Sequence, residues 1–228
     1  GSEMCIRDSG MTLDPALIPT DTAVSTYALI WDETAERKAA AFLLGDNLER
    51  TTQGGGIYTY TSQQGAAAFR DTGSFDAAGS LSQENAEAFC RDFCKAFSYD
   101  TPIFTLDETG SGTATAVRLW NGTPVFNAAV TFTIDQGRVL SASGALLPET
   151  GAETSSGQKP LSAFAALTAF QQMRHASSSV VSSITEVSLC YELQSTTAAP
   201  MALVPSWRIV TDTATFYVNC ISGTVRRA

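Results

Sequence analysis

The sequence predicts an α+β fold, with curved antiparallel sheets and helices packed on one face of each sheet. Three observations lead to this prediction. Stretches with apolar residues at helical spacing are each followed by stretches that alternate with a period of two. Residues typical of hairpin turns separate the alternating stretches. A helix packed on a sheet can cover only one of its faces, so helix-then-strands units favour this architecture.

The chain divides into four segments by this pattern. Residues 10–79 are expected to form an N-terminal helix with strands, residues 80–150 a middle helix-plus-sheet unit, and residues 160–228 a C-terminal helix-plus-sheet unit. Between the last two, the stretch from Pro148 to Lys159 is polar and rich in small residues, which predicts a flexible connection. The units differ in length, so they share a plan and not a fixed-period repeat.

The first nine residues have a different character. The run Met4-Cys5-Ile6-Arg7-Asp8-Ser9 resembles the translation of a transposon adaptor used in sequencing libraries, and an ordinary N-terminal segment is the alternative. On the first interpretation native sequence begins near Gly10, and any signal or anchor encoded upstream is missing. We therefore exclude residues 1–9 from the fold prediction.

The first unit begins with a helix predicted from about Asp32 to Leu44, which Gly45 would end. Two strands are expected next, at 57–62 and 66–70, joined by a turn at Gln63-Gln64-Gly65.

The second helix is expected to start at Ser82, whose hydroxyl can cap it, with Leu81 as a hydrophobic staple and Glu84 at the positive end of the dipole. Its apolar stripe follows helical spacing: Ala86, Phe89, Cys90, Phe93 and Phe97. Strands are predicted at 113–120, 125–134 and 139–144. Asn121-Gly122 and Asp135-Gln136-Gly137 are the hairpin turns between them.

The third helix is predicted from Pro160, which suits a first turn, to about His175. Strands follow around Val187–Leu193, from Trp207, and from Phe216 to Cys220.

Composition narrows the class of partner. A net charge of −9 with only three lysines argues against a nucleic-acid surface and an anionic membrane surface. No segment reaches the roughly 20 apolar residues that cross a bilayer, and no signal peptide is visible.

Four cysteines lie outside the first nine residues. Cys90 and Cys94 share the stripe of the second helix, and we interpret them as small buried residues, with half of a metal site as the alternative. Cys190 and Cys220 are expected on opposite faces of their strands, where they could not pair. The prediction is four free thiols.

No motif indicates a reaction. The one histidine, His175, lies at a helix end, where it can interact with the last carbonyl groups. Ser156-Gly157-Gln158-Lys159 matches the spacing of a Ser-Lys dyad, but it lies in the polar connection, where chance explains it better. The sequence therefore assigns no catalytic, metal-binding or cofactor-binding residue and predicts no cofactor.

The C-terminal residues resemble a known family. Leu203-Val204-Pro205-Ser206-Trp207-Arg208-Ile209, then Phe216-Tyr217-Val218-Asn219 and Ser222-Gly223-Thr224-Val225, are similar to the closing signature of the YycH/YycI-type regulatory proteins of Firmicutes, which also recurs in PepSY-like domains. Gly122-Thr123-Pro124-Val125-Phe126 resembles the middle of that family. The residues that carry the resemblance are structural ones: Pro124, Phe126, Pro205, Trp207, Tyr217, Asn219 and Gly223.

The resemblance implies a function without catalysis. Members of this family are held by an N-terminal transmembrane helix on the outer face of the cytoplasmic membrane. There they contact a sensor histidine kinase that controls cell-wall metabolism, and a paralogous regulator is a further partner. The expectation for this chain is the same role, with membrane attachment only through a helix absent from this sequence. A PepSY-like secreted binder or inhibitor of a protease is the alternative, and an enzyme with an unrecognised site is a third hypothesis.

Overall fold

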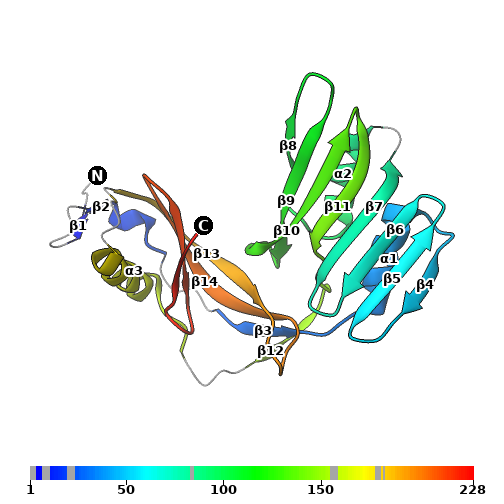
Figure 1. Cartoon of the computed structure of the whole chain (residues 1–228). Helices are drawn as coiled ribbons and strands as arrows, with labels where there is room; N and C mark the ends of the chain where they lie inside the picture. The colour runs from blue at the N-terminus through cyan, green and yellow to red at the C-terminus, as the bar shows by residue number, and fades with distance from the viewer. Residues whose placement is uncertain are drawn as a thin grey trace. The chain divides into compact units, whose positions relative to one another are not determined.

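The structure is a computed structural model that describes residues 4–6, 11–19, 24–82, 85–154, 159–177, 181 and 183–228. The chain folds into two compact units (Figure 1). Unit 1 consists of residues 1–27, 153–192 and 203–228, and unit 2 of residues 28–152 and 193–202. The chain therefore passes between the units after residues 27, 152, 192 and 202.

Unit 2 is built on an antiparallel sheet. Among the described residues eight strands pair in the order β4-β5-β6-β7-β11-β10-β9-β8 (Figure 1). Their bounds are β4 (Glu49–Thr52), β5 (Ile57–Ser62), β6 (Gly65–Arg70), β7 (Ser74–Ser82), β8 (Ile103–Leu106), β9 (Gly112–Trp120), β10 (Thr123–Asp135) and β11 (Arg138–Ala145). The boundary expected between residues 79 and 80 falls inside β7, so the two predicted units share one sheet.

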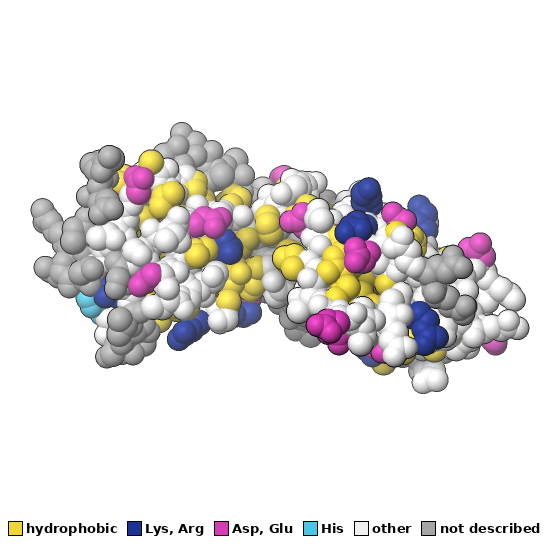
Figure 2. All heavy atoms as spheres, turned by 90° about the horizontal axis from the view of Figure 1, so that it is seen from above, with side chains coloured by type: hydrophobic (Ala, Val, Ile, Leu, Met, Phe, Trp, Pro, Cys, Tyr) yellow, Lys and Arg dark blue, Asp and Glu magenta, His cyan; other side chains and the backbone are white. Residues whose placement is uncertain are grey.

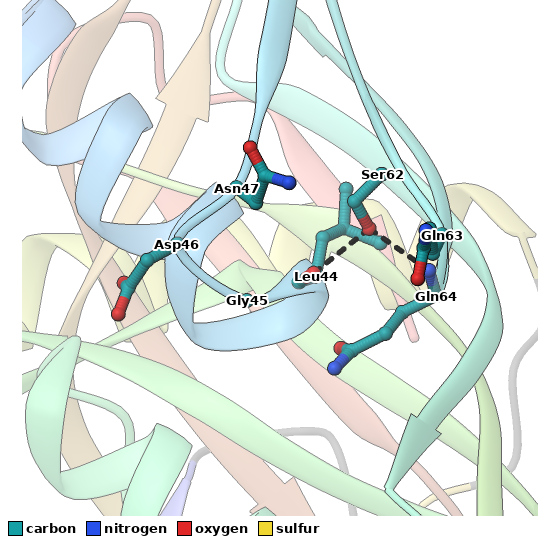
Figure 3. A pocket seen from close by; sticks show the side chains of 7 residues that line it. All are labelled: Leu44, Gly45, Asp46, Asn47, Ser62, Gln63 and Gln64. Atoms are coloured by element: carbon teal, nitrogen blue, oxygen red, sulfur yellow. Dashed lines mark hydrogen bonds between the residues drawn. The ribbon is translucent and has the colours of Figure 1, made fainter.

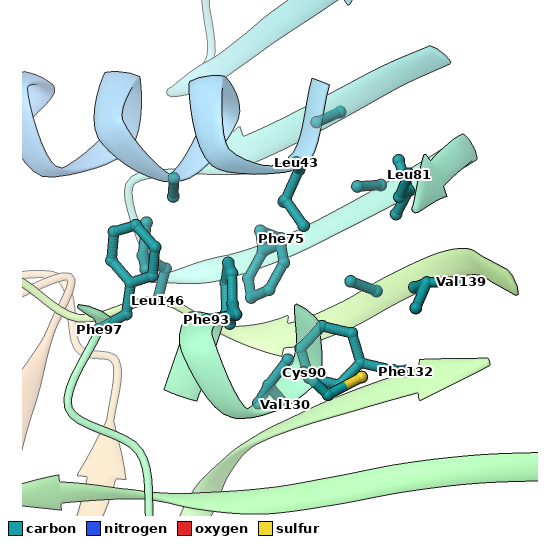
Figure 4. Close-up of a cluster of buried hydrophobic side chains, with 14 of the residues drawn as sticks. Leu43, Phe75, Leu81, Cys90, Phe93, Phe97, Val130, Phe132, Val139 and Leu146 are labelled. Carbon is teal, nitrogen blue, oxygen red and sulfur yellow. The ribbon is translucent and has the colours of Figure 1, made fainter. Parts of the chain in front are cut away.

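Two helices cover one face of this sheet, α1 (Glu33–Leu44) and α2 (Ala86–Ala96). Asp32 caps α1 by accepting from the Thr34 amide at 2.9 Å, as its place before the helix predicts. Alternate residues of the strands face these helices, because side chains alternate along a strand. The resulting core is aromatic at its centre (Figure 4), with Phe69, Phe75, Phe93, Phe132 and Leu43 among its buried members.

Unit 1 contains a second core. Its helix α3 (Ala163–Ser177) packs on a meander of β14 (Ala202–Thr211), β15 (Thr215–Asn219) and β16 (Val225–Arg227), next to β13 (Ser183–Gln194). Near the N-terminus lie β1 (Met4–Ile6), β2 (Met11–Leu13) and a 3-10 turn at Pro15–Leu17. β2 pairs in parallel with β13, with Thr12 opposite Ser183, and antiparallel with β1. Phe170, Trp207, Ile209 and Phe216 are buried between helix and strands.

Two strands lie where the chain passes from one unit to the other, β3 (Thr26–Leu29) and β12 (Gly151–Thr154). β12 occupies part of the stretch from Pro148 to Lys159, so part of that stretch is ordered strand and the expectation of a flexible connection is wrong there.

The architecture is α+β, as predicted. Three local predictions fail. Ser82 does not cap α2 because it belongs to β7, and Asn85 caps the helix instead, accepting from the Ala88 amide at 3.1 Å. Leu81 likewise belongs to β7. Pro160 lies before α3, and Ser162 accepts from the Ala165 amide at 3.1 Å at its start.

Candidate interaction surface

The face of the unit 2 sheet opposite the helices carries two uninterrupted rows of cross-strand neighbours. The first row runs from β4 to β8 as Glu49, Thr61, Ala66, Ala78, Ser141, Thr133, Thr113 and Thr105. The second runs as Thr51, Thr59, Ala68, Asp76, Ser143, Thr131, Thr115 and Ile103. Thr, Ser or Ala occupies every position except Glu49, Asp76 and Ile103. We call these sixteen residues the open face.

The open face is low in charge and made of short side chains. Asp76 forms an ion pair with Arg70 at 2.9 Å, which leaves Glu49 at the β4 end as the other charged group of the two rows. Figure 2 shows acidic and basic side chains interspersed over the described residues of each part of the chain, without a patch of one sign in that view. Charged residues are depleted at the core of protein interfaces, as they are in these two rows, so the open face is a candidate interaction surface.

Five of the seven signature residues lie close together in unit 1. Pro205 and Trp207 are buried in β14, and the Trp207 indole donates to the Leu161 carbonyl at 2.8 Å. Asn219 ends β15 and accepts from the Ile221 and Ser222 amides at 2.8 and 2.9 Å, which shapes the turn that contains Gly223. Gly223 has φ +71°, a conformation that favours glycine. These residues hold the β14–β15–β16 meander in place.

Tyr217 faces away from the core of unit 1. In the sheet register it lies opposite Arg208 on β14 and Arg226 on β16. Arg208 pairs with Glu186 at 2.9 Å, and Arg226 pairs with the buried Glu192 at 2.7 Å. The outer side of this sheet is therefore charged with both signs, in contrast to the open face of unit 2.

The other two signature residues belong to unit 2. Pro124 is exposed and Phe126 is half-buried near the start of β10. Between Val125 and Ala129 the pairing of β10 with β9 shifts register, so both residues lie at an irregular part of the strand. The structure thus does not bring the seven signature residues into one site.

Unit 2 contains two buried charged groups that the sequence did not predict. Glu36 on α1 is 0% exposed, and its Oε1 accepts from the Tyr60 hydroxyl at 2.6 Å and from Arg50 Nε at 3.1 Å. Burial, and then the bond to Glu36, raises the pKa of Tyr60. These groups connect α1 to β4 and β5.

Arg118 on β9 is the second buried group, at 1% exposure. Its Nη1 donates to the carbonyls of Ser98 and Leu119 at 3.2 and 2.5 Å. Its Nη2 donates to those of Leu147 and Pro148 at 3.4 and 3.1 Å. Burial lowers the pKa of the guanidinium despite the nearby Glu149 at 3.7 Å. Arg118 holds two chain segments against the sheet.

The four cysteines are buried free thiols, as predicted. Cys90 and Cys94 belong to the unit 2 core and Cys220 to the unit 1 core. Cys190 lies on the other side of its strand, where its Sγ donates to the Ser206 carbonyl at 3.4 Å. Burial raises the pKa of each thiol to about 12, so these groups stay protonated at neutral pH.

The remaining motif residues fall in separate places. His175 is exposed in the last turn of α3, where it was expected. Ser156 lies outside the described residues. Asn121 and Gly122 both have positive φ and form the hairpin turn between β9 and β10. Within the described ranges, no three His, Cys, Asp or Glu side chains are grouped as metal ligands would be.

Two hollows lie in unit 2. The smaller, about 190 Å³, lies between the end of α1 and the β5–β6 turn, where Ser62 donates to the Leu44 carbonyl at 2.8 Å (Figure 3). The larger, about 450 Å³, is lined by Trp31, Tyr58 and Asp71 and by apolar residues of the segments 28–30 and 198–201. Trp31 and Tyr58 stack with centroids 5.4 Å apart, and Arg50 lies 4.6 Å from the Tyr58 ring centre.

Helices long and apolar enough to span a membrane are not found in the described part of the chain.

The fold defines a class of α+β protein whose antiparallel sheets carry helices on one face. No protein-family model matches the chain, and no curated protein matches it in sequence.

Solved structures resemble this fold. An uncharacterized protein from Eubacterium rectale ATCC 33656 aligns with a TM-score of 0.51 and 12% identity, over 99% of this chain and 88% of that one. The C-terminal domain of YpeB from Bacillus megaterium aligns at 0.41 with 14% identity, over 88% and 98% of the two chains. YycH from Bacillus subtilis aligns at 0.42 with 12% identity, over 92% and 52%. The first of these alignments shows a shared fold.

Proposed function

We propose that this protein is a non-catalytic regulator that acts through contact with another protein. Its partner in this proposal is a sensor histidine kinase of the cytoplasmic membrane that controls cell-wall metabolism. The regulator would meet the kinase on the outer face of that membrane, and a paralogous regulator would be a second partner.

The observation that supports contact as the mode of action is the open face of unit 2. Its two rows are low in charge and built mostly from short side chains, and the charge of Asp76 is neutralised by its ion pair with Arg70. Its hydroxyl groups have no histidine beside them in the two rows, and the charged residues there are Asp76, already paired, and Glu49. Such a surface suits binding better than nucleophilic chemistry.

The identity of the partner rests on the sequence resemblance. Three of the signature residues stabilise one meander: Trp207 and Asn219 through side-chain hydrogen bonds and Gly223 through its positive φ, which gives a physical reason for these residue types in that order. The resemblance to the outward-facing regulators therefore involves a whole folded element of unit 1.

The test is recovery of the partner from the host. The tagged protein is expressed in its host, crosslinked on intact cells and purified, and we expect a sensor kinase to be recovered with it. Recovery of a secreted protease without a kinase would contradict the proposal and favour the protease-binding alternative.

A pair of variants tests the role of the open face. Thr133→Glu with Ala66→Glu adds two charges to its first row, three strand positions apart, and should abolish recovery of the kinase. Thr34→Glu with Gln63→Glu adds the same charge at exposed positions off the open face and should leave recovery unchanged. Equal recovery with both double variants would show that the open face is not the contact.

A further inference from the structure

The two edges of the unit 2 sheet differ in how they are protected. At one edge β4 carries Glu49 and Arg50 within four residues, and charged side chains are a common protection against unwanted strand pairing. At the other edge β8 reads Ile103-Phe104-Thr105-Leu106, with no charge, proline or bulge. Among the described strands β8 pairs only with β9, so its outer side is unpaired.

The backbone of β8 offers a definite set of hydrogen-bonding groups. The Asp107 amide donates to the Ser111 carbonyl at 2.9 Å, which makes these two residues a hydrogen-bonded pair at the end of the ladder. Narrow and wide pairs alternate in an antiparallel ladder, so Ile103 and Thr105 bond to β9. Phe104 and Leu106 therefore direct their N–H and C=O groups away from the sheet.

The side chains at this edge are incompletely covered. Phe104 and Leu106 face the core but are only half-buried, and Arg91 of α2 lies 5.2 Å from the Phe104 ring centre. On the other side Ile103 is 73% exposed at the end of the second row of the open face. A further strand beside β8 would cover the edge of the core and extend both rows.

The charges that flank β8 indicate the chemistry of that strand. Asp100 precedes it, and Asp107 and Glu108 follow it, all of them exposed. Bonds from Thr109 and Ser111 lower the pKa of Asp107, so it stays ionised. A second copy of this chain fits poorly, because an antiparallel β8 would bring its own acids to the same ends. With Phe104 opposite itself, Asp100 would face the second copy's Glu108.

We infer that the outer edge of β8 accepts an extended segment of a partner protein as an added strand. Apolar side chains of that segment face Phe104 and Leu106, and basic residues at its two ends face Asp100, Asp107 and Glu108. The inference deepens the proposed function by naming how a partner is held, and it rests only on contact with another protein, whatever that partner is.

A synthetic peptide tests the inference directly with the purified full chain. The probe is Lys-Lys-Val-Thr-Val-Thr-Val-Lys-Lys, which is expected to pair antiparallel with β8, so that its valines face the core and the valine amides donate to β8. Its matched controls are the same peptide N-methylated on the valines, which removes those donors, and N-methylated on the threonines, which does not. Binding is measured by fluorescence anisotropy, and backbone protection by amide hydrogen exchange.

We expect the unmodified and threonine-methylated peptides to bind alike, and the valine-methylated peptide about tenfold or more weaker, since main-chain bonds supply affinity in strand addition. Exchange at the Phe104 and Leu106 amides should slow. Asp100→Lys with Glu108→Lys should weaken binding about tenfold. Asp46→Lys with Glu153→Lys makes the same charge change at exposed positions away from β8 and should have no such effect.

Several outcomes would overturn the inference: no binding of the unmodified peptide, equal loss with both methylated peptides, equal effects of the two charge reversals, or protection at β4 instead of β8. Circular dichroism and urea unfolding confirm that each variant is folded. None of these outcomes affects recovery of a kinase from the host, so failure of the inference is distinguishable from failure of the proposed function.

Discussion

Replacing Arg118 with lysine tests whether one buried side chain holds two segments of unit 2 together. The guanidinium spans two pairs of carbonyls, Ser98 with Leu119 and Leu147 with Pro148. A lysine ammonium keeps the charge but offers a single nitrogen, so it can serve only one pair.

The expected loss of stability comes from the two backbone carbonyls that lose their donor. Each buried carbonyl left without a partner costs about 1–3 kcal/mol, so the loss of two should lower the free energy of unfolding of Arg118→Lys by about 2–6 kcal/mol. The contact with Glu149 adds little, since that carboxylate is 57% exposed and 3.7 Å away. Arg91→Lys is the control. Its pair with Glu87 is half-exposed and should change stability by less than about 0.5 kcal/mol.

The assay is urea unfolding followed by tryptophan fluorescence. Trp31 and Trp120 belong to unit 2 and Trp207 to unit 1, so a Trp207→Phe background reports on unit 2 alone. Equal stability losses for Arg118→Lys and Arg91→Lys would refute the reasoning that the carbonyl contacts, and not the charge, make Arg118 necessary.

Two further predictions use the pKa shifts. Tyr60→Phe should cost about 1–3 kcal/mol at pH 8, because Glu36 loses a buried donor. A raised folded-state pKa means that the stabilisation by Tyr60 is full below its unfolded value of 10.0 and is lost as pH rises above it, so unfolding curves at pH 9 and 11 should differ less in the variant than in the wild type. The four thiols, with pKa values raised to about 12, should react with iodoacetamide at pH 8 on the order of 10³-fold more slowly in the folded chain than in urea. Fast labelling of any one in the native protein, detected by mass spectrometry, would contradict its assignment as buried.

Local signals in the sequence predicted the hairpins well. Asn121-Gly122 and Gln136-Gly137 adopt positive φ in the structure, and the turn needs that conformation whatever surrounds it. The α1 cap at Asp32 is similarly local. The α+β class could be predicted because the spacing of apolar residues in a helix or a strand can be recognised in each segment without knowledge of the rest of the chain.

The pairing of β7 with β11 could not be predicted in the same way. β7 has small residues at its centre, such as Ala77, Ala78 and Gly79, which have low strand propensity. It is a strand because β6 and β11 lie on its two sides, and β11 is about 60 residues away along the chain. Because β7 was not predicted, Ser82 was interpreted as the start of the second helix instead of the end of a strand.

Part of the open face could be predicted from the sequence. The alternation at Thr131-Phe132-Thr133 indicates a strand with one exposed polar side, and Ser141-Ala142-Ser143 has the same pattern. Only the register aligns such positions into rows across the sheet. The buried roles of Glu36 and Arg118 leave no signal in the sequence, because a charged residue is interpreted as exposed until its partners are known.

The parallel pairing of β2 with β13 has a consequence for synthesis. Thr12 can pair only after Ser183, 171 residues later, has been synthesised. At about 5–20 residues per second, synthesis of this stretch takes roughly 10 to 30 s. During that time residues 28–152 can already collapse, while Met11 and Leu13, buried in the finished protein, remain without their partners. A chaperone that holds short apolar segments would therefore meet this protein near its beginning, and a prematurely ended chain would contain most of unit 2 but no complete unit 1.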